Sequence, residues 1–247
     1  MRRPLIIGNW KMNTNISDAV VLATVIRDGV EDISNVEIVI CPPAIWLTEV
    51  SEIIHKNIGH LGLGAQNIHY LTDGSYTGEV SATMVRDVAK YVIIGHSERR
   101  NSFAETNGIV ARKVAAALDA GLVPIVCVGE KKKSEKSAVE IVKQLKESLV
   151  GINKNELEQI VVAYEPVWAV GADEPATPEY SAQIINQLRA IVSPQTPIIY
   201  GGDVSSGNIY SFMQRPEIDG VLVGRESLNG QNFIKLCRIV AEYKKII

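Results

Sequence analysis

The 247-residue sequence lacks the features that mark several classes of protein. No apolar run approaches the roughly 20 residues that cross a bilayer, so we expect no membrane partner. No Lys/Arg block is interleaved with aromatic residues and the net charge is -3, so nucleic acid is not an expected partner. No stretch rich in Pro, Gly and Ser divides the chain. The sequence therefore predicts one domain over residues 1–247.

Cysteine is scarce, and its distribution disfavours disulfide frameworks and zinc sites. The three cysteines are Cys41, Cys127 and Cys237, which are far apart and form no CxxC pair. Residues 1–8 contain no apolar core of a signal peptide before polar residues return. No metal-ligand spacing occurs, and the chemistry outlined below needs no cofactor. We expect a cytoplasmic protein in a reducing compartment.

Short apolar runs alternate with amphipathic segments along the whole chain, in an ordinary globular composition with 46% hydrophobic residues. The runs that predict strands are 5–10, 36–41, 60–67, 91–96, 123–129, 160–165, 197–201 and 220–224. The segments with helical spacing are 17–30, 44–56, 82–89, 105–120, 134–149, 178–192, 206–215 and 231–245. Ser17 and Thr177, the latter before Pro178, are typical of helix N-termini.

Strands separated by helices pair in parallel, because a parallel neighbour requires a crossover connection. Eight strand–helix units predict an α/β fold, a single-domain (β/α)₈ barrel rather than an open sheet. In such barrels the active site lies at the C-terminal ends of the strands. Polar residues and glycines follow the predicted strands at these ends: Asn9, Lys11, Gln66, Asn67, His96, Ser97, Glu98, Glu130, Glu165, Gly201, Gly202, Asp203, Gly224 and Arg225.

Each of these residues alone has an ordinary explanation. Glu165 could cap a strand, Lys11 could be a surface lysine, and Gly201 with Gly202 could form only a tight turn. Their convergence on one face instead favours a reaction. A carboxylate base would remove a proton beside a carbonyl while an imidazole polarises the oxygens and a lysine offsets charge. The loops after the seventh and eighth strands would hold a phosphate through their backbone N–H groups.

Seven motifs carry a resemblance to a known family. In one-letter code they are GNWKMN (8–13), GAQN (64–67), YTGE (76–79), IGHSERR (94–100), CVGE (127–130), AYEPVWAVG (163–171) and YGG (200–202). In this order and spacing they are highly specific. The chain resembles triosephosphate isomerase, the family that gives the TIM barrel its name, over essentially its whole length.

The resemblance implies a homodimeric, cofactor-independent isomerase of triose phosphates. Glu165 would shuttle the proton through an enediolate and a neutral His96 would act as electrophile, a pairing established for the family. Lys11 and Asn9 would contact substrate, and Glu98 would support Lys11. Thr77 would insert beside the partner's Lys11 and His96.

The resemblance also implies a lid that closes over the substrate. Its hinge would be Pro166, Val167 and Trp168, and the N–H of Gly171 would reach the phosphate. The implied lid residues are Pro166, Val167, Trp168, Ala169, Val170, Gly171, Ala172, Asp173, Glu174, Pro175 and Ala176. The implied substrate-binding residues are Asn9, Lys11, Gly171, Asp203, Gly224 and Arg225.

Three stretches depart from the family pattern: the lid tip at 171–176, Asp203 in place of serine, and Arg225 in place of glycine. A carboxylate beside a phosphate dianion is repulsive, by about 1 kcal/mol or more. We hypothesise that Arg225 compensates Asp203, either as an ion pair or by turning toward the phosphate. Two other functions stay open at this point: isomerisation of a longer ketose phosphate such as a tetrulose phosphate, and a non-catalytic phosphate-binding barrel.

Overall fold

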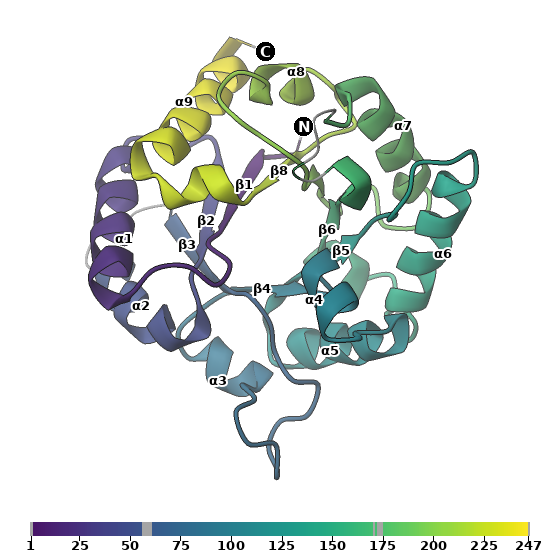
Figure 1. The fold of residues 1–247 in the computed structure, drawn as a ribbon, viewed down its shortest axis with the longest axis horizontal. Coiled ribbons are helices and arrows are strands. Elements are labelled where there is room, and N and C mark those ends of the chain that lie inside the picture. The colour runs from purple at the N-terminus through teal and green to yellow at the C-terminus, as the bar shows by residue number, and fades with distance from the viewer. Residues whose placement is uncertain (1, 56–60, 170, 172–174, 247) are drawn as a thin grey trace.

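The computed structural model describes residues 2–55, 61–169, 171 and 175–246, and its strands close into a barrel (Figure 1). The described residues contain eight parallel strands, which pair in chain order, with β1 closing the ring against β8. They are β1 (Leu5–Asn9), β2 (Glu37–Cys41), β3 (Leu61–Ala65), β4 (Tyr91–Ile94), β5 (Val123–Val128), β6 (Val161–Tyr164), β7 (Ile198–Tyr200) and β8 (Gly220–Val223).

The strands are apolar throughout because both of their faces are buried. Along β1, the side chain of Ile7 packs into the barrel interior, and that of Ile6 packs beneath the helices. Cys41 and Cys127 belong to the interior cluster, whereas Cys237 lies in the outer one. All three thiols are buried and free. The two-sided burial explains why the strands read as short hydrophobic runs without polar alternation.

Helices ring the barrel in Figure 1 and cover the outer face of its strands. They are α1 (Ile16–Val30), α2 (Leu47–His55), α3 (Ala82–Arg86), α4 (Ser97–Ser102), α5 (Asn107–Asp119), α6 (Ser137–Ser148), α7 (Pro178–Arg189), α8 (Ile209–Met213) and α9 (Gly230–Ile246). Short 3₁₀ turns are η1 (Ala44–Trp46), η2 (Glu156–Gln159), η3 (Val167–Ala169) and η4 (Arg225–Leu228). In the part of the chain that the structure describes, no helix combines the length and apolarity needed to span a membrane.

The predicted barrel and its eight strand–helix units are confirmed, with small differences at element ends. The first helix is capped by Asn15, whose side chain accepts the N–H of Asp18, so the predicted start at Ser17 is wrong by one residue. The short helix α4 was not predicted, because polar residues directly after β4 show no apolar periodicity. The predicted cap at Thr177 before Pro178 is confirmed. Predicted ends at residues 56 and 60 lie outside the described residues.

Candidate active site

A cavity of about 460 Å³ opens at the C-terminal ends of the strands. Its wall contains thirteen of the residues that the sequence predicted for the site and the lid: Asn9, Lys11, His96, Ser97, Glu98, Glu165, Val167, Gly171, Gly201, Gly202, Asp203, Gly224 and Arg225. It also contains Asn13, Asn101, Val204, Leu222, Glu226 and Leu228, which the sequence did not indicate. Most of these six are neutral residues beside predicted ones, so only their place in the fold identifies them.

Glu165 lies at the end of β6 with a side chain that is 3% exposed. Its Oε2 accepts the backbone N–H of Ser97 at 2.9 Å, and its Oε1 lies 3.0 Å from Nε2 of His96. Burial alone would raise the pKa of Glu165, but His96 and the Ser97 N–H outweigh it and lower the pKa. The carboxylate is therefore ionised at neutral pH and poised to accept a proton.

His96 caps the N-terminus of α4, and its Nδ1 accepts the N–H of Glu98 at 3.3 Å. Burial lowers the pKa of His96, but the neighbouring Glu165 carboxylate raises it, and the net direction is upward. The Glu98 carboxylate, with Oε2 3.6 Å from Nδ1, adds to this rise in pKa, whereas the Glu98 N–H opposes it because a proton on Nδ1 would face another donor. The hydrogen bonds are satisfied by a neutral imidazole that carries its proton on Nε2 and donates it to Glu165.

Two glycines let the backbone approach closely enough to form this pair. A Cβ on Gly129 would lie 1.7 Å from the main-chain carbonyl oxygen of Glu165, so only glycine fits against the backbone that carries this carboxylate. Gly95 has φ +69, and a Cβ there would meet Val110 at 2.7 Å. Glycine at these two strand ends is therefore a packing requirement of the Glu165–His96 geometry.

Lys11 reaches the cavity from a left-handed backbone conformation with φ 53, which is uncommon for a residue other than glycine. Its N–H donates to Oδ1 of Asn9 at 3.0 Å, and its carbonyl accepts Nε2 of Gln66 at 2.9 Å. Its Nζ pairs with Glu98 at 2.6 Å. Both charged side chains are partly exposed, so the pair orients Lys11 more than it stabilises the fold.

The loops after β7 and β8 also contribute to the cavity wall. Ser227 is fully buried and donates its hydroxyl to the carbonyl of Gly224 at 2.6 Å, which fixes the turn after β8. Asp203 and Arg225 are both exposed at the cavity wall, and no ion pair joins them. Of the two compensating arrangements hypothesised from the sequence, this geometry leaves the one in which Arg225 turns toward the phosphate.

Glu130 joins the start of the predicted lid to the barrel. Its Oε1 accepts three donors: Tyr164 Oη at 3.1 Å, Trp168 Nε1 at 2.7 Å and Tyr180 Oη at 2.9 Å. The Nζ of Lys133 lies over the rings of Trp168 and Tyr180, at 5.3 and 4.7 Å from their centroids. Burial and the Glu130 carboxylate raise the pKa of Tyr164, so that phenol remains a donor. Nothing in the sequence around Tyr180 marks it as a partner of Glu130, because it occupies an ordinary position in the amphipathic helix α7.

Four of the candidates outside the lid do not line the cavity. Gln66 supports the Lys11 backbone, Glu130 lies beneath the hinge, and Asn67 accepts Lys113 Nζ at 2.6 Å. Thr77 is exposed on the loop between β3 and α3, which projects from the barrel at the bottom of Figure 1.

The predicted lid is only partly described. Residues 170 and 172–174 lie outside the described residues, whereas Gly171 lines the cavity and Ala176 is buried. Within the described residues, no group of three or more His, Cys, Asp and Glu side chains could hold a metal ion.

Comparisons with known proteins agree over nearly the full chain. A family model described as triosephosphate isomerase matches residues 4–240. A triosephosphate isomerase of Dehalococcoides mccartyi is 42% identical over 99% of this chain and 100% of its own length. One from Endomicrobium trichonymphae is 41% identical over 96% and 99%. The crystal structure of triosephosphate isomerase from Bartonella henselae superposes with a TM-score of 0.86 at 34% identity, covering 96% of this chain and 98% of that one.

Proposed function

The chain belongs to the triosephosphate isomerase family, and from that premise we propose which of its residues carry the reaction. Its activity is the interconversion of triose phosphates, D-glyceraldehyde 3-phosphate and dihydroxyacetone phosphate. The proposal is supported by the buried Glu165–His96 pair, which lies in the same cavity as Lys11 and the two glycine-bearing loops. We propose that residues 1–247 act as one domain.

Glu165 is the base that moves the proton between the two carbons of the substrate. Its lowered pKa keeps it ionised, and its carboxylate borders the cavity at the mouth of the barrel. In the resting site the carboxylate is hydrogen-bonded to Ser97 and His96. Substrate binding must therefore replace at least one of these contacts with the carbon acid before proton transfer can begin.

His96 is the electrophile, with its Nε2 proton directed to the substrate oxygens. The Glu98 N–H at its Nδ1 supports the neutral tautomer. A neutral imidazole donates to the oxygen that becomes negative in the enediolate without leaving a charge that must later be neutralised. The pairing of a glutamate base with a neutral histidine is a known property of the family.

Lys11 and Asn9 contact the substrate, and Glu98 keeps Lys11 in place through the 2.6 Å ion pair. The phosphate is held by backbone N–H groups of Gly171, Asp203, Gly224 and Arg225. This role is supported by their position in the wall of the same cavity as Glu165. Closure of the lid from Pro166 to Ala176 excludes water during the reaction, with its hinge at the Trp168–Glu130 contact.

We propose a homodimer in which Thr77 reaches the partner's Lys11 and His96. Exposed apolar side chains support this, because eight of the eleven large ones among the described residues follow the consecutive strands β1 to β4: Met12, Ile16, Val21, Ile45, Leu71, Tyr76, Met84 and Phe103. The other three are Val139, Val150 and Tyr210. Met12 is 97% exposed in the monomer, next to Lys11. Sedimentation at micromolar concentration is expected to give a dimer, and Thr77→Arg is expected to shift it toward monomer. A wild-type monomer would contradict the proposal.

The buried free thiols are in keeping with a reducing compartment, and we propose that the enzyme acts in the cytoplasm.

A coupled assay on both triose phosphates tests the assigned base. Glu165→Gln is expected to lower kcat by about 10³-fold, since general acid–base catalysis contributes roughly 10²–10⁴-fold. Glu52→Gln removes an exposed carboxylate on α2 and serves as the matched control, with activity unchanged. Undiminished turnover in Glu165→Gln would refute the assignment. Assay of a tetrulose phosphate alongside decides between the triose and the longer ketose substrate.

A further inference from the structure

The charge of the cavity wall is unfavourable for the anionic substrate. Among the described lining residues, four carboxylates (Glu98, Glu165, Asp203 and Glu226) stand against two cations (Lys11 and Arg225). With His96 neutral, the wall carries a net charge of -2. A phosphate monoester adds a further charge of about -1.5 to -2 at pH 7. Backbone N–H groups supply partial charges only, so a full positive charge near the phosphate matters more in this cavity than in an uncharged one.

Most of the charged side chains in the wall are already committed to partners. Lys11 pairs with Glu98 at 2.6 Å, and Glu165 is bound by His96 and Ser97. Glu226 accepts the side-chain amide of Asn232 at 2.9 Å. The side chain of Arg225 makes no hydrogen bond or ion pair with any residue that the structure describes. It is thus the one cation of the described wall without a carboxylate partner there.

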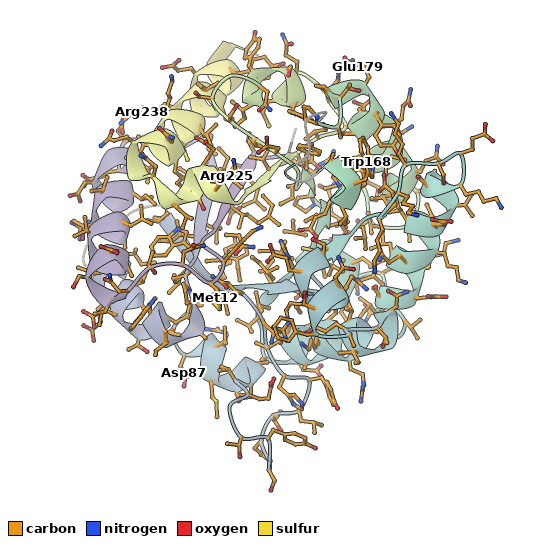
Figure 2. All side chains as sticks on the ribbon, viewed as in Figure 1. Met12, Asp87, Trp168, Glu179, Arg225 and Arg238 are labelled. Carbon is orange, nitrogen blue, oxygen red and sulfur yellow. The ribbon has the colours of Figure 1, made fainter. Side chains whose placement is uncertain are left out.

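Arg225 also has suitable chemistry and position. It follows Gly224, the turn residue that Ser227 fixes after β8 (Figure 2). The Lys11 stem passes close to this turn, with Cε 3.3 Å from where a Cβ on Gly224 would lie. Both cations therefore approach the cavity from neighbouring positions. The planar guanidinium fork matches two phosphate oxygens at once, which an ammonium cannot do.

We propose that the Arg225 guanidinium binds the substrate phosphate directly and determines the preference for phosphorylated over unphosphorylated substrates. It offsets Asp203 and Glu226, which face the same cavity. The inference rests on the proposed function, because it presumes that the phosphate lies on the β7–β8 side. It adds a side-chain contact to the backbone contacts proposed above.

Steady-state kinetics of Arg225→Gln, Arg225→Lys and a control variant test this. Arg225→Gln is expected to raise KM for glyceraldehyde 3-phosphate about tenfold, with kcat changed far less, because a charge-assisted contact to the phosphate is lost. Arg225→Lys keeps the positive charge but lacks the planar guanidinium fork, so its KM is expected to lie between those of the wild type and Arg225→Gln. Inhibition by inorganic phosphate is expected to weaken in parallel with KM.

Arg238→Gln is the matched control, because it removes one exposed arginine on α9 that pairs with Asp32, away from the cavity (Figure 2). Its KM and phosphate inhibition are expected to match those of the wild type. Unphosphorylated glyceraldehyde serves as the second substrate: Arg225→Gln is expected to lower kcat/KM for it much less than for the phosphate ester.

The possible outcomes distinguish failure of the proposed function from failure of the Arg225 proposal. If wild-type enzyme lacks activity on triose phosphates, or Glu165→Gln retains it, the proposed function fails. If the enzyme is active and Arg225→Gln keeps the wild-type KM and phosphate inhibition, the inference alone is overturned. An equal loss on both substrates would also overturn it, since that indicates a general structural role. Arg225 is exposed and has no described partner, so its variants are expected to fold.

Discussion

Glu165 and Arg225 face the same cavity, but their surroundings differ in almost every physical respect. Glu165 is 3% exposed, fixed by two donors, and packed so closely over Gly129 that no Cβ fits between them. Arg225 is exposed and makes no contact with a charged partner among the described residues. The proton-transfer side depends on packing and short hydrogen bonds, whereas the phosphate side depends on charges that solvent and salt reach. Substitutions around Glu165 should therefore reduce activity strongly, whereas substitutions around Arg225 should change substrate affinity by smaller factors.

The largest effect is expected where packing beneath the base is broken. Gly129→Ala places a Cβ 1.7 Å from the Glu165 carbonyl, so the backbone must shift. We expect a loss of about 3 kcal/mol in the free energy of unfolding and loss of most activity. Chemical denaturation and the coupled assay measure both. Gly108→Ala in α5, where the nearest atom is 3.9 Å away, is the control and should stabilise slightly. Equal behaviour of the two variants would contradict the packing argument.

The loss of activity on protonation of Glu165 should be nearly as large as the loss in Gly129→Ala. Because His96 and Ser97 lower the pKa of Glu165, the ionised base persists below the usual glutamate pKa of about 4.3. At acid pH, protonation of His96, whose pKa is raised, removes the neutral electrophile first; protonation of Glu165 then lowers activity a further tenfold per pH unit, but only below its lowered pKa. The contribution of the group to stability is lost in the same direction, as pH falls through the folded pKa.

Unphosphorylated glyceraldehyde is the substrate for this measurement, because the phosphate itself titrates near pH 6. Circular dichroism at each pH separates unfolding from titration of the base. A Glu165 carboxyl that titrates well above pH 4.3, followed by its carbon-13 NMR shift, would show instead that burial dominates over the hydrogen bonds.

Loss of the hydrogen bond between Trp168 and Glu130 at the proposed hinge should lower kcat by an intermediate factor. Trp168→Phe keeps an aromatic ring against Tyr180 but removes the donor to Glu130. We expect about a threefold to tenfold lower kcat and a stability loss of about 1 kcal/mol. Tyr180→Phe removes a donor to the same oxygen from α7, so it should cost similar stability with little change in kcat. The same kcat in both variants would argue against a special role of the hinge.

The smallest effect is expected at Asp203. Asp203→Ser removes the exposed carboxylate that repels the phosphate, so KM for glyceraldehyde 3-phosphate should fall about twofold to threefold at low salt. The difference should shrink at 0.5 M salt, where the Debye length is only a few ångströms. Asp87→Ser, at the far end of α3 (Figure 2), is the matched control. A KM that rises in Asp203→Ser would show that this carboxylate helps binding.

A double-mutant cycle of Asp203→Ser with Arg225→Gly measures whether the two charges act together on substrate affinity. Additive effects would indicate that each acts on the phosphate independently.

The sequence alone predicted the barrel, the meeting of Glu165 with His96, and the unusual Asp203 and Arg225. Eight alternating units and a set of polar strand ends are local patterns, and the Glu165 and His96 motifs need only a few neighbouring residues to be recognised. Glycine at 95 and 129 could also be found in these motifs, although the reason for it lies in contacts with Val110 and Glu165.

Only the tertiary structure decided how distant side chains meet. The three donors of Glu130 come from β6, η3 and α7, and nothing local in α7 marks Tyr180 as one of them. Asp203 and Arg225 lie on adjacent loops, yet they do not pair, and only coordinates reveal which charges are already committed. Local propensity and motif spacing act over a few residues, whereas hydrogen bonds and charge balance depend on distances set by the closed barrel.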